Sequence, residues 1–200
     1  MVIRLATGHD AAAVAEIYRP AVASTVISFE VDPPGEPEMQ RRIEETLIDF
    51  PWLVCEDRGR LIGYAYATRH GVRAAYQWSV DTSVYVHSDF HSLGVGRGLY
   101  TSLFRVLSAQ GFINAYAGIT LPNPRSVGLH EAIGFRPVGV YRKVGYKLSE
   151  WHDVGWWQLL LQPRPATPPA PLNLRRIEDD PAWQGMLATG LASIRVNRTP

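Results

Sequence analysis

The sequence is nearly without cysteine, since Cys55 is the single thiol among its 200 residues. One thiol excludes an intramolecular disulfide framework, and no zinc ligands stand near it in WLVCED, so we expect Cys55 to be a small buried apolar residue. An excess of charge of either sign is also missing, because 20 lysines and arginines oppose 19 aspartates and glutamates, for a net charge of +1. This balance argues against a nucleic-acid partner held by bulk electrostatics.

Long uncharged apolar runs are absent as well, so the sequence predicts no membrane span and no membrane partner. The first residues, MVIRLATGHD, lack the apolar core of a signal peptide, and we expect a cytoplasmic location. What is present is an ordinary globular composition, 46% hydrophobic and 20% charged. A chain of this length can form one well-packed domain with a small appendage.

Hydrophobic periodicity predicts a chain in which strands and helices are mixed. The order is one strand, two helices, a run of strands, and then helix, strand, helix and two strands, which is typical of an α/β sandwich around one mixed sheet. The predicted strands are 2–6, 52–57, 60–70, 77–90 and 112–120, with a closing hairpin over 139–161, and the predicted helices are 11–22, 36–49, 97–110 and 123–133.

The composition changes abruptly after Gln162, where PRPATPPAP begins. Proline imposes an extended, semi-rigid backbone, so the sequence predicts a domain over 1–162, a linker over 163–171 and a tail over 172–200. Within the tail, DDPAWQGMLATGL predicts a short helix with Asp180 as its cap. Trp183 favours an ordered tail, while the surface on which the tail docks stays open.

Three glycines at alternate positions, Gly94, Gly96 and Gly98, precede the predicted helix 97–110. Unpaired amides and the positive end of the dipole make a glycine-rich helix start a candidate phosphate cradle, and a tight turn is the plainer interpretation. The stretch lacks the Gly-Lys-Ser/Thr triplet of a P-loop. It also lacks the acidic residue that a dinucleotide fold places about 20 positions later.

The segment His91–Gly96, HSLGVG, resembles the acyl-CoA loop of the GNAT superfamily of N-acetyltransferases, with histidine where that family usually has glutamine or arginine. NPRSVGLHEAIGF resembles the second signature of the family. Together with YRPAVASTVISFE, YQWSVDTSVYV and GYKLSEWHDVGWWQ, these segments resemble the phosphinothricin acetyltransferase branch over residues 2 to 162. The resemblance implies a GNAT-type mixed sheet flanked by helices, with the proline-rich C-terminal extension outside it. It also implies a homodimer, and acetyl-CoA as co-substrate for acetylating the α-amine of a small amino acid or analogue such as phosphinothricin, methionine sulfoximine or methionine sulfone.

The resemblance also assigns residues to the cofactor. Val84 and Val86 would pair with pantetheine through their main chain, and Asn123 and Ser126 would contact the cofactor from the second signature. In the loop, main-chain amides bind pyrophosphate whatever the side chain. The loop residues so assigned are His91, Leu93, Gly94, Val95, Gly96, Arg97 and Gly98.

Two residues are candidates for proton transfer. Asp81 stands in DTSVYV where the resembling branch carries glutamate, and an aspartate in an apolar strand needs a partner. Because aspartate is one methylene shorter than glutamate, we expect a base that acts through a bound water. The alternative is a carboxylate that is merely paired with an arginine such as Arg73. By the resemblance, His130 is the candidate acid near the thiol, or else a group used mainly for orientation, and a helix-surface histidine is the plainer interpretation.

The resemblance places the acceptor among Phe29, Glu30, Arg73 and Tyr76, where Arg73 could pair with a substrate carboxylate. A solvated loop with a hydrophobic anchor is the alternative for this segment. We expect no metal, because the spacing of His87, Asp89 and His91 matches no usual zinc pattern. Two other functions stay open at this stage: a non-catalytic acyl-CoA-binding regulatory module and a protein or peptide N-acetyltransferase.

Overall fold

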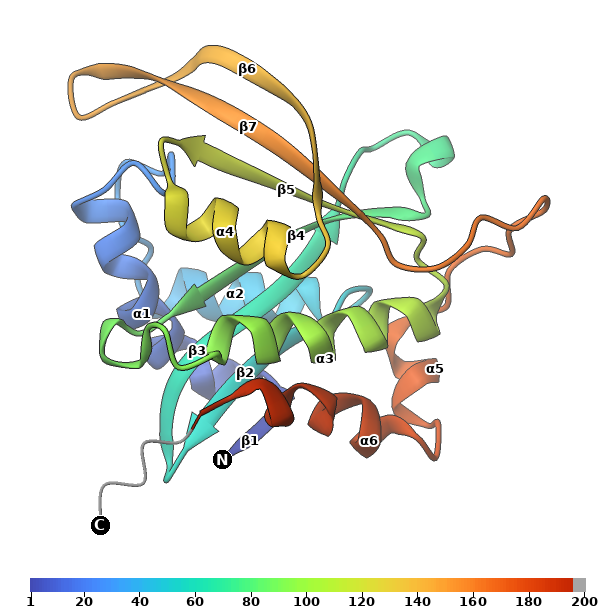
Figure 1. Ribbon diagram of the computed structural model, residues 1–200. Helices are drawn as coiled ribbons and strands as arrows, with labels where there is room; N and C mark the ends of the chain where they lie inside the picture. The colour runs from blue at the N-terminus through green and yellow to red at the C-terminus, as the bar shows by residue number, and fades with distance from the viewer. Residues whose placement is uncertain (196–200) are drawn as a thin grey trace.

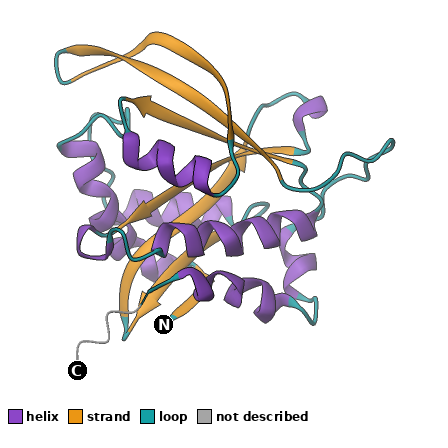
Figure 2. Cartoon of the chain, in the orientation of Figure 1, coloured by secondary structure: helices purple, strands orange, loops and turns teal. Residues whose placement is uncertain are grey.

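A seven-stranded mixed sheet forms the centre of the computed structural model, which describes residues 1–195 (Figures 1 and 2). The strands lie in the order β1-β2-β3-β4-β5-β7-β6. Within the described residues, β4 and β5 are a parallel pair and all the other neighbours are antiparallel. The strands are β1 (Val2–Leu5), β2 (Trp52–Asp57), β3 (Arg60–Arg69), β4 (Ser79–Val86), β5 (Asn114–Leu121), β6 (Arg136–Lys147) and β7 (Glu150–Leu160).

Helices cover both faces of the sheet, because the strands alternate their buried side chains between two cores. In β2, Leu53 and Cys55 pack on the side of α3 (Val95–Gln110) and α4 (Pro124–Ala132). Trp52 and Val54 pack on the other side, against α1 (Ala11–Ala23) and α2 (Glu36–Thr46). The predicted α/β sandwich around one mixed sheet is therefore confirmed.

The predicted strand 77–90 is too long at both ends. A 3₁₀ turn, η2 (Ala74–Tyr76), precedes β4, and a second turn, η3 (Ser88–Phe90), follows it. The apolar composition of QWSVDTSVYVHSDF continues past the strand because Phe90 packs against the core from the turn. The helix predicted at 97–110 begins two residues earlier, at Val95, which is itself buried.

The tail packs on its own chain. It forms α5 (Leu174–Glu178), α6 (Trp183–Ala188) and the 3₁₀ turn η4 (Thr189–Ser193), and α5 was not predicted. Trp183 and Leu187 belong to the same core as α3, which Figure 1 shows lying directly above α6. Between β7 and α5 the proline-rich run has no regular element, and the Trp78 indole donates to the Pro169 carbonyl at 2.7 Å.

Among residues 1–195, no helix has the length and apolar character needed to cross a membrane.

Candidate functional site

The strands β4 and β5 separate soon after they begin. They pair at three positions, of which the last joins Asp81 to Tyr116, and the two arrows then diverge in Figure 1. The hydroxyl of Thr82 donates to the Tyr116 carbonyl at 3.1 Å and so replaces the next ladder hydrogen bond. On its other side β4 stays in unbroken register with β3 from Val80 to Val86, so the separation needs no bulge in that ladder. The β5-facing main chain of Val84 and Val86 is left outside any strand pairing.

The glycine loop lies directly beyond β4 and begins α3. Gly94 is the N-cap with φ of 84°, a left-handed conformation that favours glycine. In the first turn of α3, the N–H groups of Val95, Gly96 and Arg97 have no partner within the helix and project at its positive end. The Arg97 side chain is exposed at this end. The loop therefore presents the amides and the cation that a phosphate needs.

Contacts with the tail explain why two of the three loop positions are glycine. A Cβ on Gly94 would collide with the Ser193 carbonyl, and one on Gly98 would lie 2.7 Å from the Gly190 carbonyl. Gly96 faces the other way, and a Cβ there would lie 3.2 Å from Leu129 of α4 and 3.7 Å from Val86 of β4. Gly96 therefore borders the gap between β4 and α4, whereas Gly94 and Gly98 allow the tail to approach the loop.

Most side chains of the glycine loop already have contacts within the protein. The His91 imidazole donates from Nε2 to the Val86 carbonyl at 2.9 Å, because a carbonyl can only accept. Val95 is buried in the core and Leu93 packs against that core. These three residues can therefore contribute to a cofactor through the main chain and not through freely projecting side chains.

The second signature forms the start of α4. Asn123 caps the helix, with its Oδ1 accepting from the Ser126 amide at 3.1 Å, so its Nδ2 is the atom left to face a ligand. His130 is 4% exposed and donates from Nδ1 to the Ser126 carbonyl at 2.7 Å, while its Nε2 lies 3.1 Å from the Tyr100 hydroxyl. Burial lowers the pKa of His130 and outweighs the Ser126 hydrogen bond. The ring is neutral at pH 7, which favours an orienting role over that of a proton donor.

Asp81 lies at the point where β4 and β5 part. Its Oδ1 is 2.7 Å from Nδ1 of His70, so the expected alternative partner, Arg73, is wrong. Burial raises the pKa of Asp81 although the hydrogen bond to His70 opposes the shift. Arg73 is exposed and forms no ion pair with an acidic side chain of residues 1–195. Sequence reasoning missed His70, which follows β3 directly.

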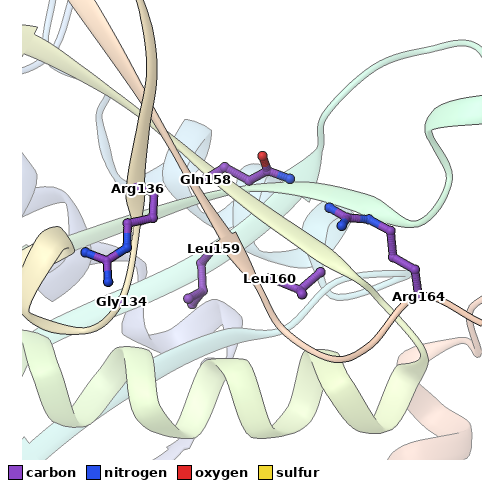
Figure 3. A pocket seen from close by; sticks show the side chains of 6 residues that line it. All are labelled: Gly134, Arg136, Gln158, Leu159, Leu160 and Arg164. Atoms are coloured by element: carbon purple, nitrogen blue, oxygen red, sulfur yellow. The ribbon is translucent and has the colours of Figure 1, made fainter.

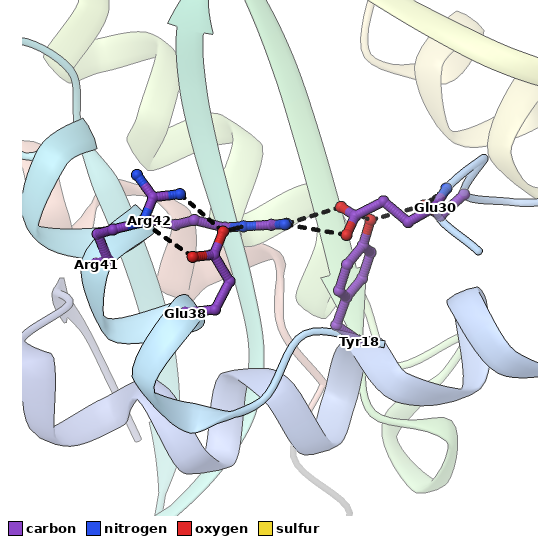
Figure 4. A network of polar contacts seen from close by, with 6 residues as sticks. Tyr18, Glu30, Glu38, Arg41 and Arg42 are labelled. Carbon is purple, nitrogen blue, oxygen red and sulfur yellow. Dashed lines mark hydrogen bonds and ion pairs between the residues drawn. The ribbon is translucent and has the colours of Figure 1, made fainter. Parts of the chain in front are cut away.

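A network of polar side chains holds the loop between α1 and α2 (Figure 4). Arg42 donates to both oxygens of Glu30, at 2.7 and 3.1 Å, and the Tyr18 hydroxyl donates to Glu30 at 2.9 Å. Burial works to raise the pKa of Glu30, but the Arg42 and Tyr18 hydrogen bonds outweigh it and lower that pKa. Glu30 therefore forms an ion pair with Arg42. This ion pair gives a structural role to a residue that the sequence analysis assigned to the acceptor site.

A hollow of about 230 Å³ adjoins this network on the α1–α2 face of the sheet. Its wall includes Tyr18 and Arg42, and also Tyr66 and Thr68 of β3. Thr68 is the register partner of Asp81, so the two residues share this face. The hollow therefore extends from the Glu30 network toward the Asp81 carboxylate.

The β6–β7 hairpin bounds the same region. The Phe29 ring lies on the backbone of Gly145 and is 6.3 Å from the His152 ring. Lys147, which is buried, donates to the Val22 and Ser28 carbonyls at 2.6 and 2.7 Å and ties the loop to β6. Tyr76 is 46% exposed, with its ring 6.0 Å from that of His70. Phe29 and Glu30 thus lie beside the hairpin and the Arg42 network, while Tyr76 lies beside His70 and its amide donates to the Arg73 carbonyl at 3.0 Å.

The residues His87, Asp89 and His91 do not form a metal site. Nη2 of Arg60 lies 2.9 Å from Nε2 of His87 and 3.3 Å from Oδ2 of Asp89. The positive charge of Arg60 disfavours a metal cation at the same place. No cluster of three metal-ligating side chains occurs in the described part of the chain.

A second hollow, of about 270 Å³, lies beside the ends of β6 and β7 (Figure 3). None of the sequence-predicted site residues lines it. Its lining consists of Gly134, Arg136, Gln158, Leu159, Leu160 and Arg164.

Comparisons with known proteins agree with this geometry. Residues 3–156 match the family model described as an acetyltransferase (GNAT) domain. The chain is 42% identical over 170 residues to the phosphinothricin N-acetyltransferase of Streptomyces viridochromogenes, a match that covers 83% of this chain and 93% of that relative. It is 32% identical over 163 residues to the L-methionine sulfoximine/L-methionine sulfone acetyltransferase of Salmonella typhimurium, covering 80% of this chain and 95% of the other. A crystal structure of a GNAT superfamily phosphinothricin acetyltransferase from Sinorhizobium meliloti in complex with acetyl-CoA superposes with a TM-score of 0.79 at 34% identity, covering 84% of this chain and 92% of that one.

Proposed function

Because the chain belongs to the GNAT acetyltransferase family, we propose that it transfers acetyl from acetyl-CoA to the α-amine of a small amino acid of the phosphinothricin or methionine sulfoximine type. The observation that carries the proposal is the gap between β4 and β5. The gap begins at Asp81 and leads to the glycine loop of α3, and it leaves the main chain of Val84 and Val86 outside strand pairing, with the Val86 carbonyl bound by His91.

The residues at the gap fit the parts of acetyl-CoA, which supplies the acetyl group as a thioester. The main chain of Val84 and Val86 would bind the pantetheine amides. The first-turn amides of α3 and the exposed Arg97 would bind the diphosphate. Asn123 Nδ2 would donate from α4, and Ser126 and neutral His130 would keep that helix start in place.

The acceptor would bind on the α1–α2 face, in the hollow whose wall includes Thr68, the register partner of Asp81. Phe29 and Tyr76 would cover its apolar chain, and the Glu30–Arg42 pair would fix the loop that carries Phe29. Arg73 is exposed beside η2 and would pair with the substrate carboxylate. At the gap, Asp81 would serve the proton transfer that an ammonium group requires before it can attack.

We further propose that two copies associate through the β6–β7 hairpin. Tyr146 of β6 and Trp151 of β7 are each 61% exposed, and their rings pack across the two strands with centroids 5.4 Å apart. Val144 and Leu148 extend this apolar surface, with exposures of 52% and 57%. Sedimentation of the wild type against Trp151→Ser would show a dimer that weakens in the variant. A wild-type monomer would contradict this arrangement.

The proposed reaction is tested by release of free CoA thiol. The panel would hold phosphinothricin, methionine sulfoximine, methionine sulfone, the common amino acids, polyamines and a lysine peptide. We expect turnover with the amino-acid analogues and a loss in kcat/KM of about 100- to 10,000-fold for Asp81→Asn. Acetyl-CoA binding without turnover on any amine would favour the regulatory module instead, and turnover confined to the peptide would favour a protein acetyltransferase.

A further inference from the structure

His70 and Asp81 form a pair at the acceptor side of the gap. His70 follows the last residue of β3, Asp81 lies near the start of β4, and their Nδ1 and Oδ1 atoms are 2.7 Å apart. Both side chains keep partial contact with solvent, at 26% and 33% exposure. The pair is therefore buried enough to be ordered and open enough to exchange a proton with a ligand or with water.

The His70 ring is held in one plane by aromatic neighbours. It stacks on Tyr116 of β5, with ring centroids 4.2 Å apart and planes 14° apart. The rings of Tyr76 and Trp156 meet it edge-on, at 6.0 and 6.2 Å. A ring fixed in this way loses little freedom when it reacts, and the Tyr116 face attracts the ring more strongly when the ring is positively charged.

The hydrogen bond to Asp81 decides which nitrogen of His70 is basic. A carboxylate accepts and cannot donate, so the proton of the neutral ring is on Nδ1 and the lone pair is on Nε2. No described residue forms a hydrogen bond with Nε2. Oδ1 of Asp81 already accepts a hydrogen bond from His70, whereas Nε2 of His70 is available to accept a proton.

We propose that Nε2 of His70 accepts the proton from the acceptor amine, and that Asp81 is the positioning residue that orients the ring and stabilises its charged form. This inference rests on the proposed function and changes the atom that performs it. The residues that face the ring are Asp81 from β4, Tyr116 from β5, Tyr76 from η2 and Trp156 from β7, so Asp81 is the one carboxylate among them.

One proton of the substrate ammonium group passes to Nε2 and from there to water at the exposed edge of the ring. The freed nitrogen lone pair forms the N–C bond to the acetyl carbon while the C–S bond breaks, and the bonding electrons leave with sulfur. The second proton lost by the nitrogen ends on that sulfur, so the products are the amide and the free thiol.

The test compares His70→Gln and His70→Ala with the wild type on an amine that the wild type acetylates. Glutamine retains an N–H donor for Asp81 and lacks a basic nitrogen. We expect kcat/KM to fall about 100- to 10,000-fold in both variants, with the KM for acetyl-CoA and the unfolding temperature little changed. His9→Gln, at an exposed histidine in the 3₁₀ turn that follows the edge strand β1, is the matched control and should retain wild-type kinetics.

Two further readouts separate proton transfer from a structural role. Free imidazole in the assay should restore turnover to His70→Ala and leave His70→Gln unchanged, because only the alanine variant leaves room for a ring. The acid limb of the pH profile should move to lower pH in His70→Gln, where a carboxylate replaces the imidazole as acceptor. Two outcomes would overturn the assignment. One is a wild-type kcat/KM in His70→Gln. The other is a His70→Ala variant that imidazole does not restore, together with an acid limb in His70→Gln at the wild-type pH. Absence of turnover in the wild type itself would instead contradict the proposed function.

Discussion

The backbone of Gly190 lies directly on the backbone of Gly98, and a methyl group on Gly190 would collide with the Gly98 carbonyl. Ser102, one turn further along α3, fastens the same contact: its hydroxyl donates to the Leu187 carbonyl at 2.6 Å and accepts from the Gly190 amide at 3.1 Å. The tail thus supports the helix that carries the glycine loop, from the side opposite to the gap between β4 and β5.

Gly190→Ala should therefore weaken both folding and cofactor binding. Overpacking of this kind costs about 1–3 kcal/mol of unfolding free energy, and displacement of the loop should raise the KM for acetyl-CoA. Gly185→Ala is the matched control, because a Cβ on that helical glycine meets nothing within 4 Å. The control should be neutral or more stable. Equal unfolding temperatures and equal KM values for the two variants would contradict a supporting role for the tail.

Loss of the Glu30–Arg42 pair should affect the acceptor and not the cofactor. Glu30→Gln removes the charge that Arg42 and Tyr18 bind, so the loop carrying Phe29 becomes less fixed. We expect a higher KM for the amino acid at an unchanged KM for acetyl-CoA, and a stability loss of about 0–1 kcal/mol since both partners are one-third exposed. Glu44→Gln, whose exposed carboxylate binds only Gln40 among the described residues, is the control. A selective rise in the acetyl-CoA KM would place Glu30 elsewhere in the mechanism.

The pair between Arg4 and Asp10 predicts how stability depends on pH. Burial works to raise the pKa of Asp10, but two hydrogen bonds from Arg4 at 2.8 Å and those from Thr7 outweigh it and lower the pKa. Because the pKa of Asp10 is lower in the folded protein than its unfolded value of about 3.9, the ionised pair stabilises the fold at neutral pH. This stabilisation is lost as the pH falls below the unfolded pKa and through the folded pKa.

Asp10→Asn should accordingly reduce the unfolding free energy at pH 7 by about 1–3 kcal/mol and much less near pH 3. Denaturant unfolding at the two pH values measures the difference. Asp32→Asn, at an exposed loop position, should show no such dependence. A deficit in Asp10→Asn that is equal at both pH values would exclude the ionised pair as its cause.

Cys55 should be inert in the native protein. The thiol is fully buried, and burial raises its pKa to about 12, so the reactive thiolate is scarce. An aromatic disulfide reagent should label the protein only after unfolding, with one equivalent of thiol per chain. Rapid labelling of the native protein would show that β2 opens readily, and it would also add a background to assays that detect CoA thiol.

The sequence was sufficient for features that depend on local pattern. Alternation in DTSVYV put Asp81 and Tyr85 on one face and Val84 and Val86 on the other, and the structure has this arrangement. The partner of Asp81 was not predicted, because it depends on the register of the β3–β4 hairpin, which pairs Thr68 with Asp81. Residues 70–78, which include η2, join the two strands, and a connection of this length does not fix their register as a two-residue turn would.

Contacts made by the tail are a second feature that the sequence alone did not predict. Gly98 was interpreted from its neighbours in sequence, as a helix start that binds phosphate. Its closest constraint is Gly190, which no periodicity within either segment could connect with it. Contacts between distant segments decide such positions, and a single sequence does not record them.

The position of Arg195 has a practical consequence for anyone who produces this enzyme. Its amide donates to the Leu93 carbonyl at 2.8 Å, so an affinity tag or fusion partner joined directly after it would begin beside the glycine loop. Met1 directly precedes the edge strand β1, and β2 and β3 lie between β1 and β4. Tags therefore belong at the N-terminus, and under the proposed function a fluorophore joined directly after Arg195 would report on cofactor binding.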